Sequence, residues 1–340
     1  MLVRPIFLPN LMIKRKHGLL SLVTLASIAA VGAAPANDSN EVAPASTLRK
    51  DDARVAAVAH RIAASDPSQC TETFPLTGML FHHLAEYEPG DRVLMINRYQ
   101  LDRGPGVLTV LGDSPAARAG LIAGDVLLAM DGLSFPPPSA IVAEPRQKQR
   151  RERMDATEAQ LEERLRQGPV QLRILRNGQE RDLTLGSEPG CLGKVRLARS
   201  KQVNAFANGR SVTITTAMLD FVRNDDELAL ILGHELSHNI LNPPAMLDEQ
   251  GVPKRGLMRA IGRNGSLVWK SEEAADRLGI RLMWSAGYDV SAAIPFWKRL
   301  YGKFEILPQI FRTHPSLGAR ERIVGEAIAA LPATRPATPE

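Results

Sequence analysis

Cysteine is scarce in this chain of 340 residues, with only Cys70 and Cys191. A serine held in a Gly-x-Ser-x-Gly elbow is missing as well. After residue 35 there is no apolar run of the roughly 20 residues needed to span a bilayer, and no internal repeat is present. These absences argue against a cysteine or serine nucleophile and against a polytopic membrane protein.

Acidic residues are absent from the first 36 positions. Lys14-Arg15-Lys16-His17 precedes an apolar stretch from Gly18 to Ala34, and Ala34-Pro35-Ala36 offers a small-residue cleavage site. This order of charged, apolar and small residues predicts a secretory signal over residues 1–36. The apolar stretch is nearly long enough to span a membrane, so an uncleaved anchor is the alternative. We expect a periplasmic or otherwise exported protein, free or tethered to the inner membrane.

The formal net charge of +5 comes mostly from that segment, which holds four basic residues. Without them the net charge is +1, so the pI of about 9.3 does not imply a nucleic-acid partner. The one dense basic run, residues 146–153, lies in a Pro-rich, polar stretch and is predicted to be a solvated loop.

One short pattern indicates a specific chemistry, namely His234-Glu235-Leu236-Ser237-His238. Two histidines four residues apart on a helix project from nearly the same face, so one zinc ion can contact both. Glu235 is then placed to act as the base for an activated water. Residues 227–233 are almost wholly apolar, which predicts a buried helix, and Asn242-Pro243-Pro244 should end it.

A third metal ligand is expected from a second helix, for which Ser271 is a candidate N-cap. Glu272 and Asp276 are again four apart, so Glu272 can bind the metal while Asp276 holds a ligand imidazole in one tautomer. Glu273 is the competing ligand, although Arg277 would face it. An acidic helix start also simply complements the helix dipole.

Together these residues resemble a group of zinc endopeptidases, the gluzincins that include the heat-shock protease HtpX and the CAAX prenyl endopeptidases. The motifs are Asn204-Ala-Phe-Ala207, Val212-Thr-Ile-Thr-Thr216, His234-Glu235-xx-His238, Glu272-xxx-Asp276 and Thr313-His314-Pro315 with Arg320. They cover about residues 195–330, and a helix near 52–64 is expected to belong with them. HtpX-like members are polytopic membrane proteins. This chain departs from them because it has no apolar run of membrane-spanning length after residue 35.

The resemblance implies one zinc ion per chain, with Glu235 as the base. The ligands it implies are His234, His238 and Glu272, supported by Asp276 and Arg320. It also implies that the strand near 211–216 borders the cleft and pairs with extended substrate. His314 would either donate to the tetrahedral intermediate or cap the zinc, but a histidine before proline is equally a packing or surface residue. The other histidines are interpreted as structural or exposed: His17, His60, His82 and His83.

A second unit, residues 101–187, lies between the two cysteines. Its predicted elements are strands at 106–111, 126–130, 170–176 and 179–185, a short helix and turn over 114–125 and an amphipathic helix at 157–167. Asn177-Gly178 is a strong hairpin-turn signal. The run from Ser114 to Gly132 resembles part of a bacterial PDZ domain.

The PDZ resemblance implies a groove between a strand edge and the helix at 157–167, which captures a peptide by strand addition. Gly104, Gly106 and Val107 would meet the terminal carboxylate of that peptide. Residues 135–155 depart from the pattern as an insertion loop, which leaves access to the groove open. A PDZ fold can also act only as a spacer.

The order of these parts predicts an α+β protein in which a β-rich PDZ domain is inserted into a mainly helical zincin with a small edge sheet. Residues 37–70 form an N-terminal helix packed on the peptidase, residues 188–330 the peptidase itself and residues 331–340 a disordered tail. Residues 71–100 form either a bridge or the first strands of the insert. An oxidising compartment favours a Cys70–Cys191 disulfide at its neck.

The expected function is that of an exported zinc endopeptidase in envelope protein quality control. Its partners would be protein or peptide substrates and a peptide in the PDZ groove, with no nucleic acid and no membrane contact beyond an uncleaved signal. Two other functions stay open. One is a peptide-binding, chaperone-like module with a weakly active zinc site, and the other is a metal-dependent amidase acting on a non-protein substrate.

Overall fold

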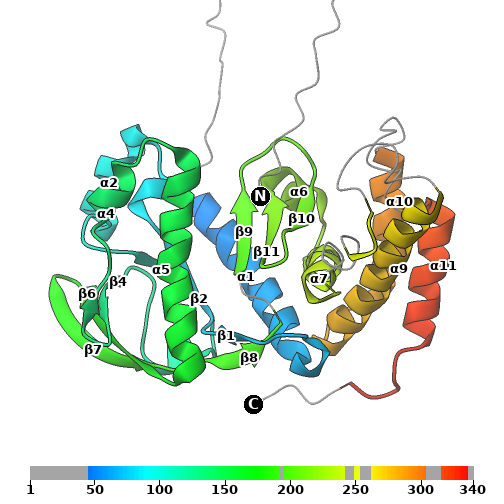
Figure 1. The fold of residues 1–340 in the computed structure, drawn as a ribbon, viewed down its shortest axis with the longest axis horizontal. Helices are drawn as coiled ribbons and strands as arrows, with labels where there is room; N and C mark the ends of the chain where they lie inside the picture. The colour runs from blue at the N-terminus through cyan, green and yellow to red at the C-terminus, as the bar shows by residue number, and fades with distance from the viewer. Residues whose placement is uncertain (1–44, 192–193, 242–248, 253–261, 304–314, 336–340) are drawn as a thin grey trace, which may run out of the picture. The chain divides into compact units, whose positions relative to one another are not determined.

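A large hydrophobic core collects segments from both ends of the described chain (Figure 1). The computed structural model describes residues 45–191, 194–241, 249–252, 262–303 and 315–335. The predicted signal over residues 1–36, His314 and the second half of the predicted tail, residues 336–340, lie outside these ranges. Among the described residues, none of the helices combines the length and apolar character that crossing a bilayer requires.

The first core is mainly helical. Its helices are α1 (Ala45–Ser65), α6 (Thr216–Phe221), α7 (Asp225–Leu241), α9 (Gly262–Ser285), α10 (Ala293–Lys303) and α11 (Leu317–Ala329). α1 buries Val55, Val58 and Ile62 completely or nearly so, and packs against α7 and α9. The apolar face predicted for residues 51–65 is therefore the face that joins this core, although more than 150 residues separate α1 from α7.

A small sheet flanks these helices, with strands β9 (Lys194–Ala198), β10 (Ala205–Ala207) and β11 (Ser211–Thr215) in the order β10-β11-β9. β11 runs antiparallel to β10 and parallel to β9. The prediction of a strand at 211–216 is confirmed. The prediction that this strand pairs with substrate is wrong, because both of its edges already carry a neighbouring strand.

A second core lies on a larger antiparallel sheet. The strands are β2 (Met79–His82), β3 (Gly106–Val110), β4 (Val126–Met130), β6 (Val170–Arg176) and β7 (Gln179–Leu185) in that order, with β5 (Leu133–Ser134) against β4. The helices are α2 (Pro89–Tyr99), α3 (Pro115–Arg118), α4 (Pro138–Val142) and α5 (Gln147–Gln167). Leu161 and Leu165 of α5 pack on the buried strand residues Leu172 and Ile174. The β6–β7 hairpin is confirmed, and its turn residues Asn177 and Gly178 have φ of 51° and 76°.

The predicted loop at residues 135–155 is wrong, because α4 and the first two turns of α5 occupy most of it. Glutamine, lysine, arginine and glutamate are good helix formers, so a basic run can be helical and solvated at once. Lys148 and Glu152 form an i, i+4 ion pair of 3.4 Å, and Met154 is buried. Arg146 remains 72% exposed at the side chain, as expected of a solvated basic run.

The two cores are joined at a narrow neck. There β1 (Phe74–Leu76) pairs antiparallel with β8 (Glu188–Gly190). A disulfide joins Cys70 to Cys191 with a Cα–Cα distance of 5.1 Å. The chain thus leaves the first core and returns to it at nearly the same point. Of the two possibilities for residues 71–100, strand β2 shows that they contribute an edge strand to the larger sheet. The helices and mostly antiparallel strands define an α+β protein.

Candidate metal site

Helix α7 begins with a well-satisfied N-terminus. The Asn224 side chain accepts a hydrogen bond from the Glu227 amide at 3.0 Å, and the Glu227 carboxylate accepts one from the Arg223 amide at 2.7 Å. Three acidic residues in the first turn favour the positive end of the helix dipole. The helix ends at Leu241, directly before the predicted Asn-Pro-Pro stop. The buried apolar residues of α7 pack in the first core and so fix the positions of His234 and His238 relative to that core.

Helix α9 lies very close to α7. A Cβ added to Gly233 would lie 3.0 Å from the carbonyl oxygen of Gly279, and one added to Gly279 would lie 3.0 Å from the amide nitrogen of His234. The two helices therefore cross backbone to backbone, next to the first histidine. This close approach brings Glu272 and Asp276 of α9 to the histidines of α7.

Three potential ligand atoms converge at this crossing. His238 Nε2 lies 3.3 Å from His234 Nε2 and 3.4 Å from Glu272 Oε1. His234 Nε2 lies 3.7 Å from Glu272 Oε2. Ligands bound at 2.0–2.1 Å to a tetrahedral zinc ion stand ~3.4 Å apart, so the triangle has the size that zinc needs. Two imidazoles and one carboxylate are also a donor set that suits zinc.

A chain of charged groups supports the triangle from behind. Asp276 Oδ1 lies 2.9 Å from His234 Nδ1, which leaves Nε2 as the atom directed at the metal position. The Arg320 guanidinium donates from Nε to Asp276 at 2.8 Å and from Nη2 to Glu272 at 3.4 Å. His234, Glu272, Asp276 and Arg320 are all less than 9% exposed. The supporting roles predicted for Asp276 and Arg320 match this placement.

The electrostatics of the site follow from burial and pairing. Burial disfavours a charged imidazole, but the hydrogen bond and charge of Asp276 outweigh it and raise the pKa of His234. Burial disfavours a charged carboxylate as well, yet Arg320 and His234 hold the pKa of Asp276 below its ordinary value. Asp276 therefore stays ionised and continues to orient the histidine.

The neighbours of the triangle are placed as follows. Glu235 follows His234 on α7, and its charge also raises the pKa of His234. Glu273 pairs with Arg277 at 2.9 Å and does not join the triangle. The prediction of Ser271 as an N-cap is wrong, because α9 already begins at Gly262. Ser271 instead donates its hydroxyl to the Val268 carbonyl at 2.7 Å, inside the helix.

His314 lies outside the described residues, so its predicted role is not addressed by the structure. The chain after it is described: Ser316 caps α11, with its Oγ accepting from the Ala319 amide at 3.4 Å. This cap starts the helix that carries Arg320 into the site. Sequence reasoning missed one further neighbour, Trp297 of α10, whose ring centroid lies 5.9 Å from that of His234. A single tryptophan in an amphipathic helix gives no signal of such a position.

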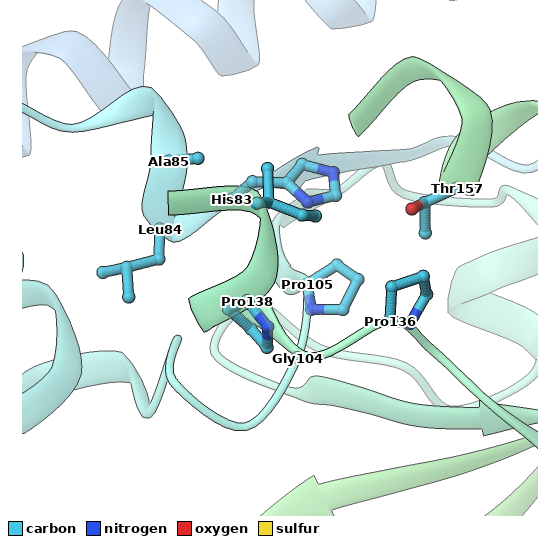
Figure 2. A pocket seen from close by; sticks show the side chains of 9 residues that line it. His83, Leu84, Ala85, Gly104, Pro105, Pro136, Pro138 and Thr157 are labelled. Atoms are coloured by element: carbon cyan, nitrogen blue, oxygen red, sulfur yellow. The ribbon is translucent and has the colours of Figure 1, made fainter. Parts of the chain in front are cut away.

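The predicted carboxylate-binding residues lie in a closely packed part of the chain. Gly104 lines a cavity of about 10 Å³, room for a single water, together with His83 and Pro105 (Figure 2). The Val107 amide already donates to the Asp125 carbonyl at 2.7 Å, and a Cβ on Gly106 would meet the His82 ring at 2.4 Å. These glycines allow close packing of the chain on itself, and their role in binding a terminal carboxylate remains a prediction.

A larger cavity of about 120 Å³ lies between the edge strand β2 and helix α5. Met79 and Phe81 of β2 and Leu161 of α5 line it on the side of the larger sheet. Ala59 of α1 and Lys194 of β9 line it on the side of the first core. The cavity thus lies where the two cores face each other.

Comparison with known proteins shows what the residues around this site are similar to. Residues 187–253 and 256–326 match the model of Peptidase family M48. The chain is 27% identical over 150 residues to the beta-barrel assembly-enhancing protease of Escherichia coli (strain K12), covering 35% of this chain and 31% of that protein. It is 29% identical over 173 residues to the mitochondrial metalloendopeptidase OMA1 of Bos taurus, covering 39% and 33%.

A relative from a plant is similar to this chain to about the same extent. The mitochondrial metalloendopeptidase OMA1 of Arabidopsis thaliana is 26% identical over 160 residues, covering 41% of this chain and 32% of that protein. The chain therefore spans about a third of the length of these relatives. The matched residues contain α7, α9 and most of α11, which supply the whole triangle and its support. This region is similar to Peptidase family M48 and to proteins named as a protease and as metalloendopeptidases.

Proposed function

We propose that this protein is an exported endopeptidase that binds one zinc ion per chain and hydrolyses peptide bonds of envelope proteins as part of protein quality control. The observation that carries the proposal is the zinc-sized triangle of His234, His238 and Glu272 beside Glu235. The signal-like N-terminus and the Cys70–Cys191 disulfide favour an oxidising compartment. The name of the E. coli relative, a protease that enhances β-barrel assembly, favours the cell envelope.

In this proposal each residue of the site has one task. His234, His238 and Glu272 hold zinc, which when bound supplies Lewis acidity that polarises the scissile carbonyl and makes water a better nucleophile. The Glu235 carboxylate accepts a proton from the attacking water and delivers it to the leaving nitrogen. Asp276 keeps the proton of His234 on Nδ1, away from the metal position. His314 stays a candidate for stabilising the tetrahedral intermediate or for capping the metal.

We infer that substrate pairs with β10 rather than β11. β10 is an edge strand, since its described pairing is with β11 alone, and it packs on α7. The Asn239 side chain of α7 accepts a hydrogen bond from the Gly209 amide at 2.7 Å, in the turn that follows β10. An extended peptide added to this edge would run beside the helix that carries both histidines.

The larger sheet is proposed to be a PDZ domain inserted in the peptidase, with its groove between β2 and α5. Gly78 stands directly before β2 with φ of +69°, and Ser114 occupies the space where its Cβ would be. The cavity of about 120 Å³ is smaller than the ~300 Å³ of a typical ligand pocket, so it admits only part of a peptide as it stands.

Fluorescence polarisation with a library of C-terminal peptides tests the groove. Binding that is lost in a Leu161→Glu variant would support it. If no peptide binds, the unit serves as a spacer instead.

Casein hydrolysis by the purified zinc-loaded protein tests the central activity. Glu235→Gln should retain zinc and lose hydrolysis by about 10²- to 10⁴-fold, because the water loses its base. Unchanged hydrolysis in that variant would remove Glu235 from the mechanism. If the wild type binds unfolded casein but does not cut it, the chaperone-like alternative holds. Hydrolysis confined to non-protein amides would indicate the amidase.

The narrower resemblance to HtpX and the CAAX prenyl endopeptidases remains a prediction, since the relatives found are other metalloendopeptidases. Export and a possible membrane tether also remain predictions. Fractionation of cells that express the protein, followed by N-terminal sequencing, tests both. Retention of residues 1–36 in a membrane fraction would identify the segment as an anchor.

A further inference from the structure

Trp297 is buried beside the proposed zinc site without touching the metal position. It lies on α10, is 4% exposed, and its ring stands edge to face with the His234 ring at a centroid distance of 5.9 Å. Its face lies 4.0 Å from the central carbon of the Arg320 guanidinium. Trp297 therefore contacts both a proposed zinc ligand and the cation that supports the other groups.

The indole nitrogen of Trp297 is buried and has no hydrogen-bond partner among the residues that the structure describes. An unsatisfied buried N–H disfavours the folded state, and phenylalanine would fill much of the same space without it. Packing alone therefore does not explain an indole at this position. Among aromatic rings, tryptophan gives the strongest cation–π attraction, and that attraction is larger when the pair is removed from water.

Arg320 contacts two carboxylates and the Trp297 ring at once. Its hydrogen bonds to Asp276 and Glu272 define two directions in the guanidinium plane, and its central carbon lies over the Trp297 ring, 4.0 Å from the ring centroid. If the plane tilts, the bonds to both carboxylates lengthen together. Asp276 then loosens its hold on His234, and Glu272 loses the donor that fixes its second oxygen.

We propose that Trp297 is a positioning residue for the metal site, which acts through Arg320 on Glu272, Asp276 and His234. This rests on the proposed zinc ligands. The stack on Trp297 holds the guanidinium plane, and the guanidinium holds a ligand carboxylate and the partner of a ligand imidazole. Loss of groups that orient metal-bound histidines weakens metal binding by ~10- to 100-fold. Because Trp297 is one step further away, the effect should be about tenfold.

The test measures zinc affinity by competition with a chelator of known affinity, alongside thermal stability. Trp297→Leu should raise the zinc Kd about tenfold, and Trp297→Phe should raise it less, since a weaker π face remains. At saturating zinc the KM for a peptide should be unchanged, because the residue is buried. Phe221→Leu is the matched control: Phe221 is an aromatic residue of α6 that packs on α10 through Phe296 and Arg299. It should lower stability and leave the zinc Kd within about twofold.

A double-mutant cycle separates positioning from packing. In an Arg320→Gln background, Trp297→Leu should change the zinc Kd by less than about twofold, since the group it positions is gone. An equal effect of Trp297→Leu in both backgrounds would overturn the proposal. So would a zinc Kd that is the same in Trp297→Leu as in the wild type, a comparison that does not depend on Arg320→Gln folding. Retention of zinc in a His234→Ala, His238→Ala variant would instead overturn the site itself.

Discussion

Asp52 of α1 carries its carboxyl group in a place that disfavours a negative charge. Burial raises its pKa to about 6, and the nearby charge of Glu86 acts in the same direction. A carboxyl group whose folded pKa exceeds its unfolded value stabilises the fold fully below the unfolded pKa of 3.8. That contribution is lost as the pH rises through about 6. Above this pH the charged group is a liability of at most about 3 kcal/mol.

The Asp52→Asn variant should therefore be more stable than the wild type at pH 8, by about 1–2 kcal/mol, and gain little or nothing at pH 4. Urea unfolding at the two pH values measures this. Asp220→Asn removes the same charge from an exposed position on α6 and serves as the control. A gain in Asp52→Asn that is equal at both pH values would show that the carboxyl group does not titrate as described.

At the same scale, some site residues could be predicted from the sequence and others could not. Helical periodicity fixes which side chains share a face, so the sequence was enough to predict four site residues: His234, His238, Glu272 and Asp276. The position of Trp297 could not be predicted, since it depends on how α10 packs against helices distant in sequence. The role of the loop glycines near Gly104 could not be predicted from the sequence, because close packing and ligand binding favour glycine equally well.

At the scale of elements, the α7–α9 crossing decides whether the ligands meet. Gly279→Ala should push the helices apart by a few tenths of an ångström, because the new Cβ meets the His234 backbone at 3.0–3.1 Å. We expect weaker zinc binding and lower stability, although alanine is the better helix former by about 1 kcal/mol. Chelator competition and thermal unfolding measure the two effects.

Gly325 of α11 provides the matched control. It is also helical, but no atom lies within 4 Å of an added Cβ. Gly325→Ala should therefore raise stability and leave zinc binding unchanged. If Gly279→Ala behaves like Gly325→Ala, the close crossing is not what places the ligands.

Three elements show which features can be predicted from the local sequence and which cannot. The β6–β7 hairpin could be predicted residue by residue, because an Asn-Gly turn and alternating strands are local signals. Helix α5 was predicted ten residues too short, because a charged run without apolar periodicity can be loop or helix. Strand β11 was correctly located, but its sheet neighbours come from separate segments, so its availability to substrate could not be predicted.

For the whole molecule, the neck predicts that the larger sheet can be removed. The Cα atoms of Cys70 and Cys191 are 5.1 Å apart, so a short linker can close the gap. Replacing residues 72–189 with a short Gly/Ser segment should leave a folded, zinc-loaded peptidase with reduced selectivity for long substrates. Circular dichroism, zinc analysis and cleavage of short and long peptides measure the outcome.

A different result would contradict the inserted arrangement. In that case the shortened protein would fail to fold, while residues 195–340 would fold and cleave substrate alone. α1 would then be dispensable to the peptidase, against its burial of Val55, Val58 and Ile62 in the first core. The two units would be arranged one after the other along the chain.

The most direct test of the whole account is the zinc content of the purified protein. Elemental analysis should find about one zinc ion per chain in the wild type, and almost none in a folded His234→Ala, His238→Ala variant dialysed under the same conditions. Circular dichroism confirms that the variant is folded. Full zinc retention in the variant would contradict the account, because the metal would then be bound away from the crossing of α7 and α9.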